Sequence, residues 1–182
     1  MSDAKRKWLS DQEWSNTQFR VPITCVDVLP IRTVASGGTE AGLIYRETPH
    51  QGRRWCLIGG RLLRNESLRD AVIRQVQEVL GAKAHCVLDT RAQPLFVAEY
   101  FSRQMKGSLF DPRQHAIGLT FVVQVQGAIT PRGEALDFRW FNFEALPNTH
   151  LFGFGQKKVV LECVRRLSGG NGASRNGRLT RR

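Results

Sequence analysis

Residues 55–82 read WCLIGGRLLRNESLRDAVIRQVQEVLGA, and this stretch guides the interpretation of the whole chain. The apolar residues 55–58 predict a short strand. Gly59 and Gly60 follow, and they predict a sharp turn whose backbone groups stay open to a ligand. Asn65 is expected to cap the N-terminus of a helix. The stretch therefore predicts a strand, a glycine-rich turn and a helix.

The expected helix has one apolar stripe and a separate polar face. Apolar residues recur at intervals of four, four and three, and at about 100° per residue they share one side of a helix. These residues are Leu68, Val72, Val76 and Val79. Arg74 and Glu78 are four residues apart, so they lie together on another face, with Gln75 between that face and the stripe. Gly81 stands where a glycine commonly ends a helix.

The same stretch resembles the Nudix box, the signature of the Nudix hydrolase superfamily. The box is Gly, five residues, Glu, seven residues, Arg-Glu, an aliphatic residue, any residue, Glu-Glu, any residue, Gly and an aliphatic residue. The residues that match in register are Gly60, Glu66, Arg74, Val76, Glu78 and Gly81. Gln75 and Val79 depart from the box, because each replaces a glutamate that holds divalent metal in active members.

Patterns elsewhere predict an α+β protein. Runs rich in β-branched and aromatic residues predict strands at 21–31, 41–46, 86–88, 94–101, 116–125 and 138–143. Polar segments predict loops at 48–54 and 102–114, and residues 156–167 predict a final helix. The resemblance implies the Nudix fold, an α/β/α sandwich with a mixed central sheet, over roughly residues 20–167.

Residues 1–19 are expected to form an N-terminal helical extension. Ser10 followed by Glu13 is a capping box, which predicts that a short helix starts there. The aromatic residues of this segment, including Trp14 and Phe19, are expected to pack on the domain or on a second subunit. Ligand stacking is the alternative role for them. A homodimer is expected, because Nudix sheets and N-terminal helices often build dimers.

The net charge of +11 is concentrated partly at the C-terminus. Residues 168–182 carry four arginines and no acidic residue, and they are rich in Gly, Ser and Asn, so a basic, disordered tail is expected. The tail lacks interleaved aromatic residues, which favours a solubilising segment over a nucleic-acid-binding one. Nucleic-acid binding through this tail is retained as an alternative.

Composition excludes several other classes. The chain has no apolar run near the ~20 residues that a membrane span requires, and its start lacks the apolar core of a signal peptide. The cysteines show no metal-type spacing; they are Cys25, Cys56, Cys86 and Cys163. Free thiols in a reducing cytoplasm are therefore expected.

Hydrolysis of a nucleoside diphosphate requires a hard cation, and Mg²⁺ prefers oxygen ligands. The sequence offers the Gly59 carbonyl, the Glu78 carboxylate and, in a later loop, Glu134. Gln75 offers only an uncharged oxygen, and Glu66 is expected to brace the loop against Arg74 rather than bind metal. Mg²⁺ is the expected cofactor, with Mn²⁺ as the alternative ion.

The chain also resembles the GDP-mannose mannosyl hydrolase branch of the superfamily, in which water attacks the sugar carbon. The matching residues are Asp27 after VPITCV, Arg46 in YRE, Arg61 in GGR and His115 in QHA. The resemblance implies that Arg46 and Arg61 bind the diphosphate and that Asp27 helps to place the substrate. From its position inside an apolar run alone, Asp27 is expected either to face a wet cleft or to pair with an arginine.

The general base of that branch is absent from its usual place. The branch has Gln-His in the loop where Glu134 and its neighbour stand here. His115 is one candidate for a replacement base, and a histidine at a strand edge without catalytic function is the alternative. Arg53 and Arg54 are either solvated charges or part of a phosphate-binding rim.

The leading hypothesis is a Mg²⁺-dependent hydrolase of a nucleoside diphosphate linked to another moiety, for example a sugar. Its catalytic residues would be Glu78, Arg61 and His115. The alternative is a weak or inactive Nudix domain that binds a nucleotide or a partner as a sensor. Loss of two metal carboxylates and of the usual base favours this second hypothesis.

Overall fold

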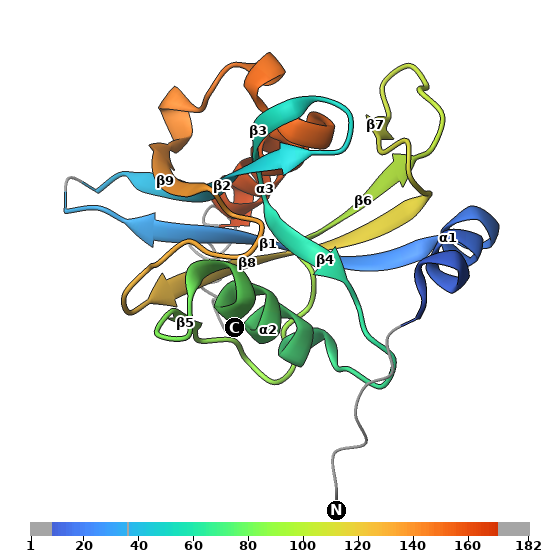
Figure 1. Cartoon of the computed structure of the whole chain (residues 1–182). Helices are drawn as coiled ribbons and strands as arrows, with labels where there is room; N and C mark the ends of the chain where they lie inside the picture. Colours follow the sequence, from blue (N-terminus) through green and yellow to red (C-terminus); the bar gives the residue numbers. More distant parts are fainter. Residues whose placement is uncertain (1–8, 36, 171–182) are drawn as a thin grey trace, which may run out of the picture.

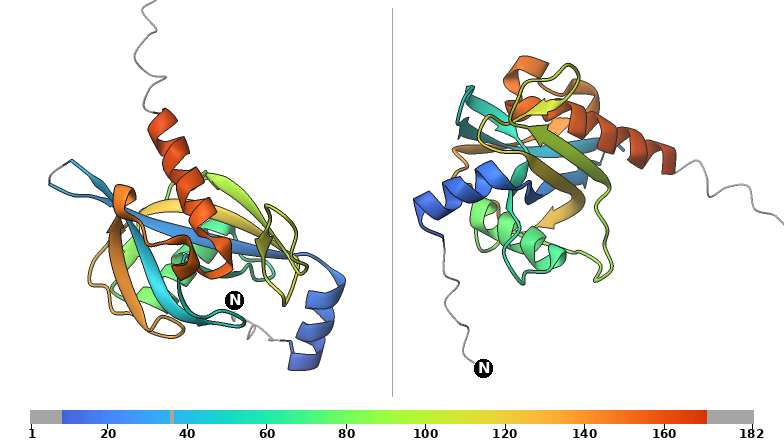
Figure 2. Two further views of the ribbon diagram at one scale, coloured as in Figure 1. Left: turned by 90° about the horizontal axis from the view of Figure 1, so that it is seen from above. Right: turned by 90° about the vertical axis from the view of Figure 1, so that its right-hand side faces the viewer.

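A mixed β-sheet with one long helix on each face makes up the fold (Figure 1). The computed structural model describes residues 9–35 and 37–170. Helix α2, Leu68–Leu80, covers one face of the sheet, and α3, Lys157–Gly170, covers the opposite face (Figure 2). Helix α1, Asp11–Arg20, lies beside one end of the sheet. The predicted α/β/α sandwich is confirmed.

The described residues contribute nine strands. These are β1 (Ile23–Thr33), β2 (Thr39–Thr48), β3 (Gly52–Cys56), β4 (Ile58–Arg61), β5 (His85–Cys86), β6 (Phe96–Phe101), β7 (Leu109–Phe110), β8 (Ala116–Gln126) and β9 (Asp137–Asn142). The main path is β3-β2-β1-β8-β6-β7, while β4 pairs with β1, β5 with β8 and β9 with β2. Strands β1 and β8 are parallel, and β1 is antiparallel to β2 and β4, so the sheet is mixed.

Strand β1 positions the site because two strands share one of its edges. Its first half pairs with β4, with Asp27 opposite Gly59, and its second half pairs with β2, with Ile31 opposite Ala41. Strands β2 and β4 therefore follow one another along the same edge. The buried side chains of β1, including Val26 and Val28 at 0% exposure, anchor this arrangement in the core.

Gly59 and Gly60 lie inside strand β4, so the turn predicted for them is wrong. The strand predicted over residues 55–58 is likewise interrupted between β3 and β4, at Leu57. Glycine is needed at both positions instead because a side chain from a neighbouring element lies close to the β4 backbone. A Cβ atom on Gly59 would collide with the Asp27 carboxylate, and one on Gly60 would lie 2.5 Å from the Gln75 amide nitrogen.

The N-terminus of helix α2 is capped by Ser67 rather than by the predicted Asn65. The Ser67 hydroxyl accepts the Asp70 backbone N–H at 3.1 Å, whereas Asn65 has a positive φ of 64° in the preceding turn. Val72, Val76 and Val79 of the predicted stripe are buried, whereas Leu68 at the start of the helix is only partly buried. The helix ends at Gly81, whose φ of 97° is costly for other residues, so the predicted terminus is confirmed.

Two predicted loops contain short strands. Strand β3 begins inside the loop predicted at 48–54, and β7 lies inside the loop predicted at 102–114. Helix α3 extends beyond residue 167 to Gly170, and the rest of the predicted tail, 171–182, lies outside the described residues.

The cysteine side chains were expected to be free thiols. All four cysteines are free, and Cys56 and Cys163 are buried.

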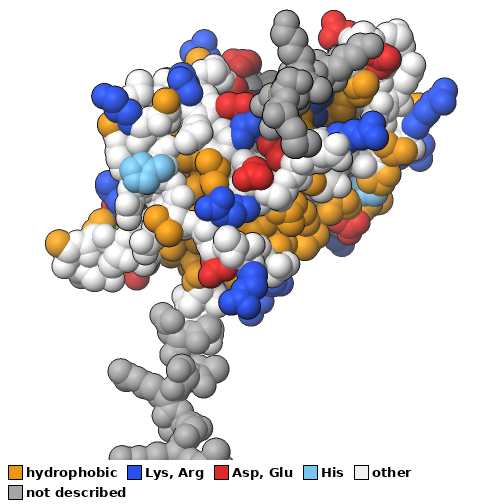
Figure 3. Space-filling view, turned by 90° about the horizontal axis from the view of Figure 1, so that it is seen from below, with side chains coloured by type: hydrophobic (Ala, Val, Ile, Leu, Met, Phe, Trp, Pro, Cys, Tyr) orange, Lys and Arg blue, Asp and Glu red, His pale blue; other side chains and the backbone are white. Residues whose placement is uncertain are grey.

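None of the helices in residues 9–35 and 37–170 is long and apolar enough to cross a membrane. On the face seen from below, acidic and basic side chains are interspersed rather than gathered into patches of one sign (Figure 3).

Candidate functional site

Two adjoining cavities lie on either side of β4. The first, here called the arginine cavity, has a volume of about 210 Å³ and contains Arg46, Arg61, Arg113 and Asp27 in its wall. The second, here called the carboxylate cavity, has a volume of about 350 Å³ and lies between β4 and α2. The residues that line both cavities are Gly59, Gly60, Arg61 and Glu134. A ligand that follows β4 can therefore contact both.

Arg46 and Arg61 enter the arginine cavity from β2 and β4. The Arg46 Nη1 atom lies 2.6 Å from Glu134 Oε2, and the Arg61 guanidinium stacks over the Trp14 ring at 4.1 Å. Both guanidinium groups are thus fixed at the cavity wall by neighbouring side chains. This placement suits phosphate binding, because guanidinium groups bind phosphate oxygens through paired hydrogen bonds.

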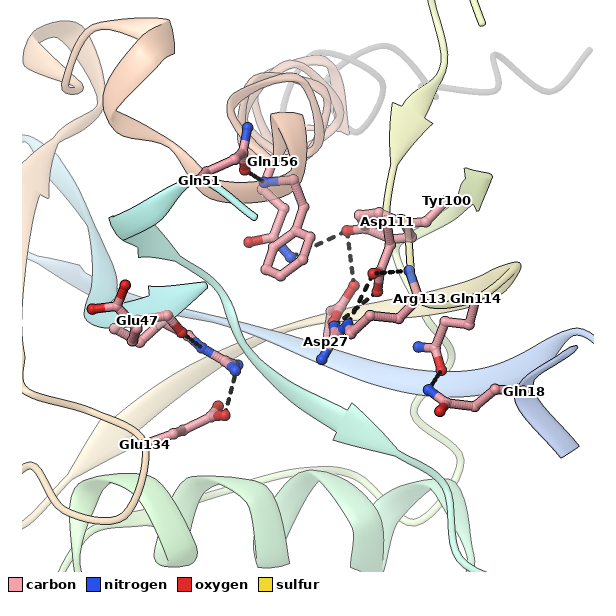
Figure 4. Close-up of polar contacts among 12 residues, drawn as sticks. Gln18, Asp27, Glu47, Gln51, Tyr100, Asp111, Arg113, Gln114, Glu134 and Gln156 are labelled. Carbon is pink, nitrogen blue, oxygen red and sulfur yellow. Dashed lines mark hydrogen bonds and ion pairs between the residues drawn. The ribbon is translucent and has the colours of Figure 1, made fainter. Parts of the chain in front are cut away.

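Arg113 is a third cation in this cavity, and it comes from the segment between β7 and β8. Its Nε and Nη2 atoms donate to the two oxygens of Asp111 at 2.9 and 2.8 Å (Figure 4). Asp111 is buried, so it holds the base of the guanidinium while 41% of the Arg113 side chain remains exposed. Arg113 also lies 5.5 Å from the ring of Phe154, another wall residue.

Asp27 is a buried carboxylate at one end of a hydrogen-bond chain. Tyr100 Oη donates to Asp27 Oδ2 at 3.2 Å, and Gln156 Nε2 donates to Tyr100 Oη at 3.2 Å (Figure 4). The Leu57 backbone N–H donates to Gln156 Oε1 at 2.9 Å and fixes the end of the chain. Burial raises the pKa of Asp27 to about 6, and the Tyr100 hydrogen bond opposes that rise. Of the two roles considered for Asp27, facing a cleft agrees with this geometry.

Glycines on two neighbouring strands make room for this carboxylate. Gly59 lies beside it on β4, and Gly118 lies beside it on β8. A Cβ atom on Gly118 would lie 2.6 Å from Asp27 Oδ2 and 3.0 Å from the Tyr100 ring. The carboxylate therefore occupies space that only a glycine pair leaves open.

The carboxylate cavity brings together the three predicted metal ligands, Gly59, Glu78 and Glu134. Glu78 pairs with Arg74 at 3.0 Å, and its side chain is 57% exposed. The Oε1 atom of Glu134 is buried without a hydrogen-bond partner, and burial raises the pKa of this carboxyl group. An unpartnered buried carboxylate oxygen is a ready ligand for a cation.

These residues fit a single Mg²⁺ ion. Among residues 9–35 and 37–170, no group of three His, Cys, Asp or Glu side chains is arranged to hold a metal. Mg²⁺ is nevertheless commonly held by one or two carboxylates plus substrate phosphates, with water completing its coordination. Glu78, Glu134 and the Gly59 carbonyl match that donor set. The arginine partners of both glutamates reduce the net negative charge, so affinity for the ion alone should be low.

The remaining box residues brace the cavity wall. Glu66 accepts from Arg74 Nε at 2.6 Å and Arg74 Nη2 at 2.9 Å, and it also accepts the Leu63 backbone N–H at 3.0 Å. Gln75 is 6% exposed, and Val79 is part of the core. Glu66 thus ties the β4–α2 connection to the helix.

His115, Arg53 and Arg54 are not brought to either cavity. The His115 ring stacks on Phe101 with centroids 5.0 Å apart, and its Nε2 lies 3.9 Å from Glu99 Oε1. It lies just before β8, between Gln114 and Ala116, which line the arginine cavity, but it is not itself part of either cavity wall. Sequence reasoning missed Tyr100, Gln156 and Arg113 as wall residues, because each comes from a distant part of the chain.

Comparisons with known proteins agree with this architecture. A family model described as "Domain of unknown function (DUF4916)" matches residues 4–162. A comparison with curated proteins found no match. A solved structure of a possible asymmetric diadenosine tetraphosphate hydrolase from Jonesia denitrificans is similar, with 28% identity, a TM-score of 0.74, and coverage of 82% of this chain and 96% of that chain.

More distant structures share the fold. The Nudix domain of Shewanella oneidensis NrtR, solved with ADP ribose, has 17% identity and a TM-score of 0.58 over 87% of this chain and 99% of that chain. A Caenorhabditis elegans Ap4A hydrolase in a binary complex has 14% identity and a TM-score of 0.57 over 81% and 98%. The neighbours described as Nudix proteins therefore share the fold of this chain. The chain belongs to the DUF4916 family, and its domain has the Nudix fold.

Proposed function

We propose that this protein is a Mg²⁺-dependent hydrolase of a nucleoside diphosphate linked to another moiety, such as a sugar or a second nucleotide. One observation carries the proposal: the arginine cavity and the carboxylate cavity share the β4 wall. Cationic groups that suit a diphosphate therefore adjoin oxygen ligands that suit its cation. The similar proteins described as diadenosine tetraphosphate hydrolases support the same class of substrate.

Each part of the wall has a distinct role in this mechanism. Arg46 and Arg61 hold the diphosphate oxygens and stabilise the charge that develops on the leaving group. Glu78, Glu134 and the Gly59 carbonyl would hold Mg²⁺, which neutralises the diphosphate and lowers the pKa of bound water. Asp27 accepts from Tyr100 and orients the bound substrate at the inner end of the cavity. His115 has no role in this mechanism because it lies outside the cavity wall.

Turnover on a panel of nucleoside diphosphate sugars and dinucleotides, with and without Mg²⁺, tests this function. We expect product only with the metal, and a loss of at least about 100-fold in Glu78→Gln because a metal carboxylate is removed. Glu99→Gln is the matched control, since Glu99 is an exposed glutamate outside both cavities. Equal turnover by Glu78→Gln and the unmodified chain would contradict the proposed metal ligand.

A nucleotide-binding domain without turnover is the second candidate. The observation that favours it is the burial of Gln75 and Val79 at positions where active Nudix members carry glutamates. In that case, nucleotides would raise the melting temperature without any product. The Gln75→Glu and Val79→Glu changes together would then strengthen metal binding, although each places a charge in a poorly solvated site.

We also propose a homodimer that uses the outer side of α1. Phe19 at the end of α1 is 90% exposed, and Val21 just after it is 50% exposed. Adjacent exposed apolar side chains of this kind favour burial against a second copy.

A further inference from the structure

Helix α1 has no buried residue, yet it is a well-defined helix. Ser10 and Glu13 form a reciprocal capping box at its start, with the Ser10 backbone N–H donating to Glu13 Oε2 at 2.8 Å. Trp14 and Gln18 are one turn apart and therefore share a face, and both line the arginine cavity. The helix thus contributes its side chains to the cavity rather than to the core.

Trp14 supplies a flat aromatic surface beside a phosphate-binding group. Its ring lies against the Arg61 guanidinium at 4.1 Å and is only partly buried. A planar base stacks favourably on an indole ring or on a guanidinium plane, whatever the identity of the base. Since Arg61 is assigned to the diphosphate, a base stacked here would be attached close to its phosphates.

Gln18 and Gln114 line the arginine cavity together with Trp14, and their side-chain amides offer a ligand one hydrogen-bond donor and one acceptor. Gln18 Nε2 donates to Gln114 Oε1 at 2.7 Å (Figure 4). This contact leaves Gln18 Oε1 as an acceptor and Gln114 Nε2 as a donor, and both side chains line the cavity. Adenine carries an amino donor next to a ring-nitrogen acceptor, which is the pattern that an amide matches. Guanine instead carries two neighbouring donors on its N1/N2 edge, which an all-acceptor carboxylate matches.

On the basis of the proposed function, we propose that α1 forms the nucleobase subsite of the arginine cavity and selects adenine. Trp14 stacks the base, and the Gln18–Gln114 amide pair binds its edge. The substrate class is accordingly an adenine nucleotide with a second moiety on its diphosphate. Trp14 and Gln18 are specificity residues, whereas Arg46 and Arg61 bind any diphosphate.

Calorimetric titration of the full chain with ADP and with inorganic pyrophosphate, both with Mg²⁺, tests the stacking role. We expect Trp14→Ala to weaken ADP binding about tenfold while pyrophosphate affinity changes less than about twofold, because only ADP carries a base. Trp14→Phe should retain most of the ADP affinity. Equal losses for both ligands would mean that Trp14 only positions Arg61, and they would overturn the inference.

A specificity exchange tests the role of the amide pair. The unmodified chain should bind ADP more tightly than GDP, and Gln18→Glu should reverse that order, because a carboxylate accepts from the two guanine donors. Gln12→Glu is the matched control, since Gln12 contacts Asn16 and does not line the cavity. An unchanged ADP-to-GDP ratio in Gln18→Glu would overturn the assignment.

The two proposals fail in different ways. Pyrophosphate binding with equal ADP and GDP affinity would overturn the nucleobase subsite and leave the proposed function standing. If the unmodified chain bound neither pyrophosphate nor either nucleotide, the proposed function would fail and the subsite with it.

Discussion

Asp27 gives the protein a stability that depends on pH in an unusual direction. Burial raises its pKa from the ordinary value of 3.8 to about 6, so the native state holds the proton more tightly than the unfolded chain does. The contribution of this group to the free energy of unfolding is therefore greatest below about pH 4 and declines as the pH rises. It is lost above about pH 6. At about 1.4 kcal/mol per pKa unit, the loss is about 3 kcal/mol.

Asp27→Asn removes this titration but keeps an oxygen that can accept from Tyr100. We expect the variant to gain about 3 kcal/mol relative to the unmodified chain between about pH 4 and pH 8. Urea unfolding of both proteins at each pH measures the difference, and comparison within one pH cancels the other titrating groups. If the difference in the free energy of unfolding between the two proteins were the same at every pH, burial would not raise the pKa of Asp27.

The ion pairs of α2 were predictable residue by residue. Arg74 and Glu78 are four residues apart, and helix geometry alone brings them together at 3.0 Å. The hydrogen bond between Asp27 and Tyr100 was not predictable, because the two residues are 73 positions apart and meet only through strand pairing. The spacing of residues along a helix predicts contacts within that helix. It gives no information on contacts between strands that are distant in the sequence.

At the scale of elements, substitution of Ser67 tests whether this residue, rather than the predicted Asn65, caps the N-terminus of α2. Ser67→Ala removes the acceptor for the Asp70 backbone N–H, so we expect the free energy of unfolding to fall by about 1 kcal/mol. Ser67→Asn should restore most of that loss, because asparagine is also a good cap. Urea unfolding at one pH measures both changes. If Ser67→Ala were silent, the helix would have to be capped elsewhere.

The glycine pair shows why an element can be misread from sequence. Gly59 and Gly60 resemble a turn, since glycine is frequent in turns. Their actual neighbours are the Asp27 carboxylate from β1 and the Gln75 amide from α2, which leave no room for a Cβ atom. A glycine in a strand commonly marks such an approach, but the approaching group cannot be identified from the strand itself.

At the scale of the whole molecule, the apolar end of α1 predicts the oligomeric state. Sedimentation velocity should show a dimer, and Phe19→Ser should shift it toward the monomer by removing an apolar side chain that is 90% exposed. Asn16→Ser, on the same helix, is the matched polar control. A monomer for the unmodified chain at micromolar concentration would contradict the proposed dimer.

The overall architecture was more accessible to sequence analysis than the site. The spacing of the box and the apolar runs predict the sandwich, because burial patterns repeat along each element. The arginine cavity instead draws Trp14, Arg113 and Gln156 from three separate regions. Their assembly depends on the parallel pairing of β1 with β8 and on the path of the chain into α3, which no local pattern specifies.

Helix α1 contributes residues to the wall of the arginine cavity but none to the hydrophobic core. Ligand choice and folding therefore depend partly on different segments of the polypeptide. Changes in β1 or β4 disturb both properties, since their side chains serve the core and the cavity together. Changes at Trp14 and Gln18 of α1 alter ligand choice without removing a core side chain. The same sheet can therefore acquire a new ligand preference through replacement of one short segment, with little risk to the folded state at each step.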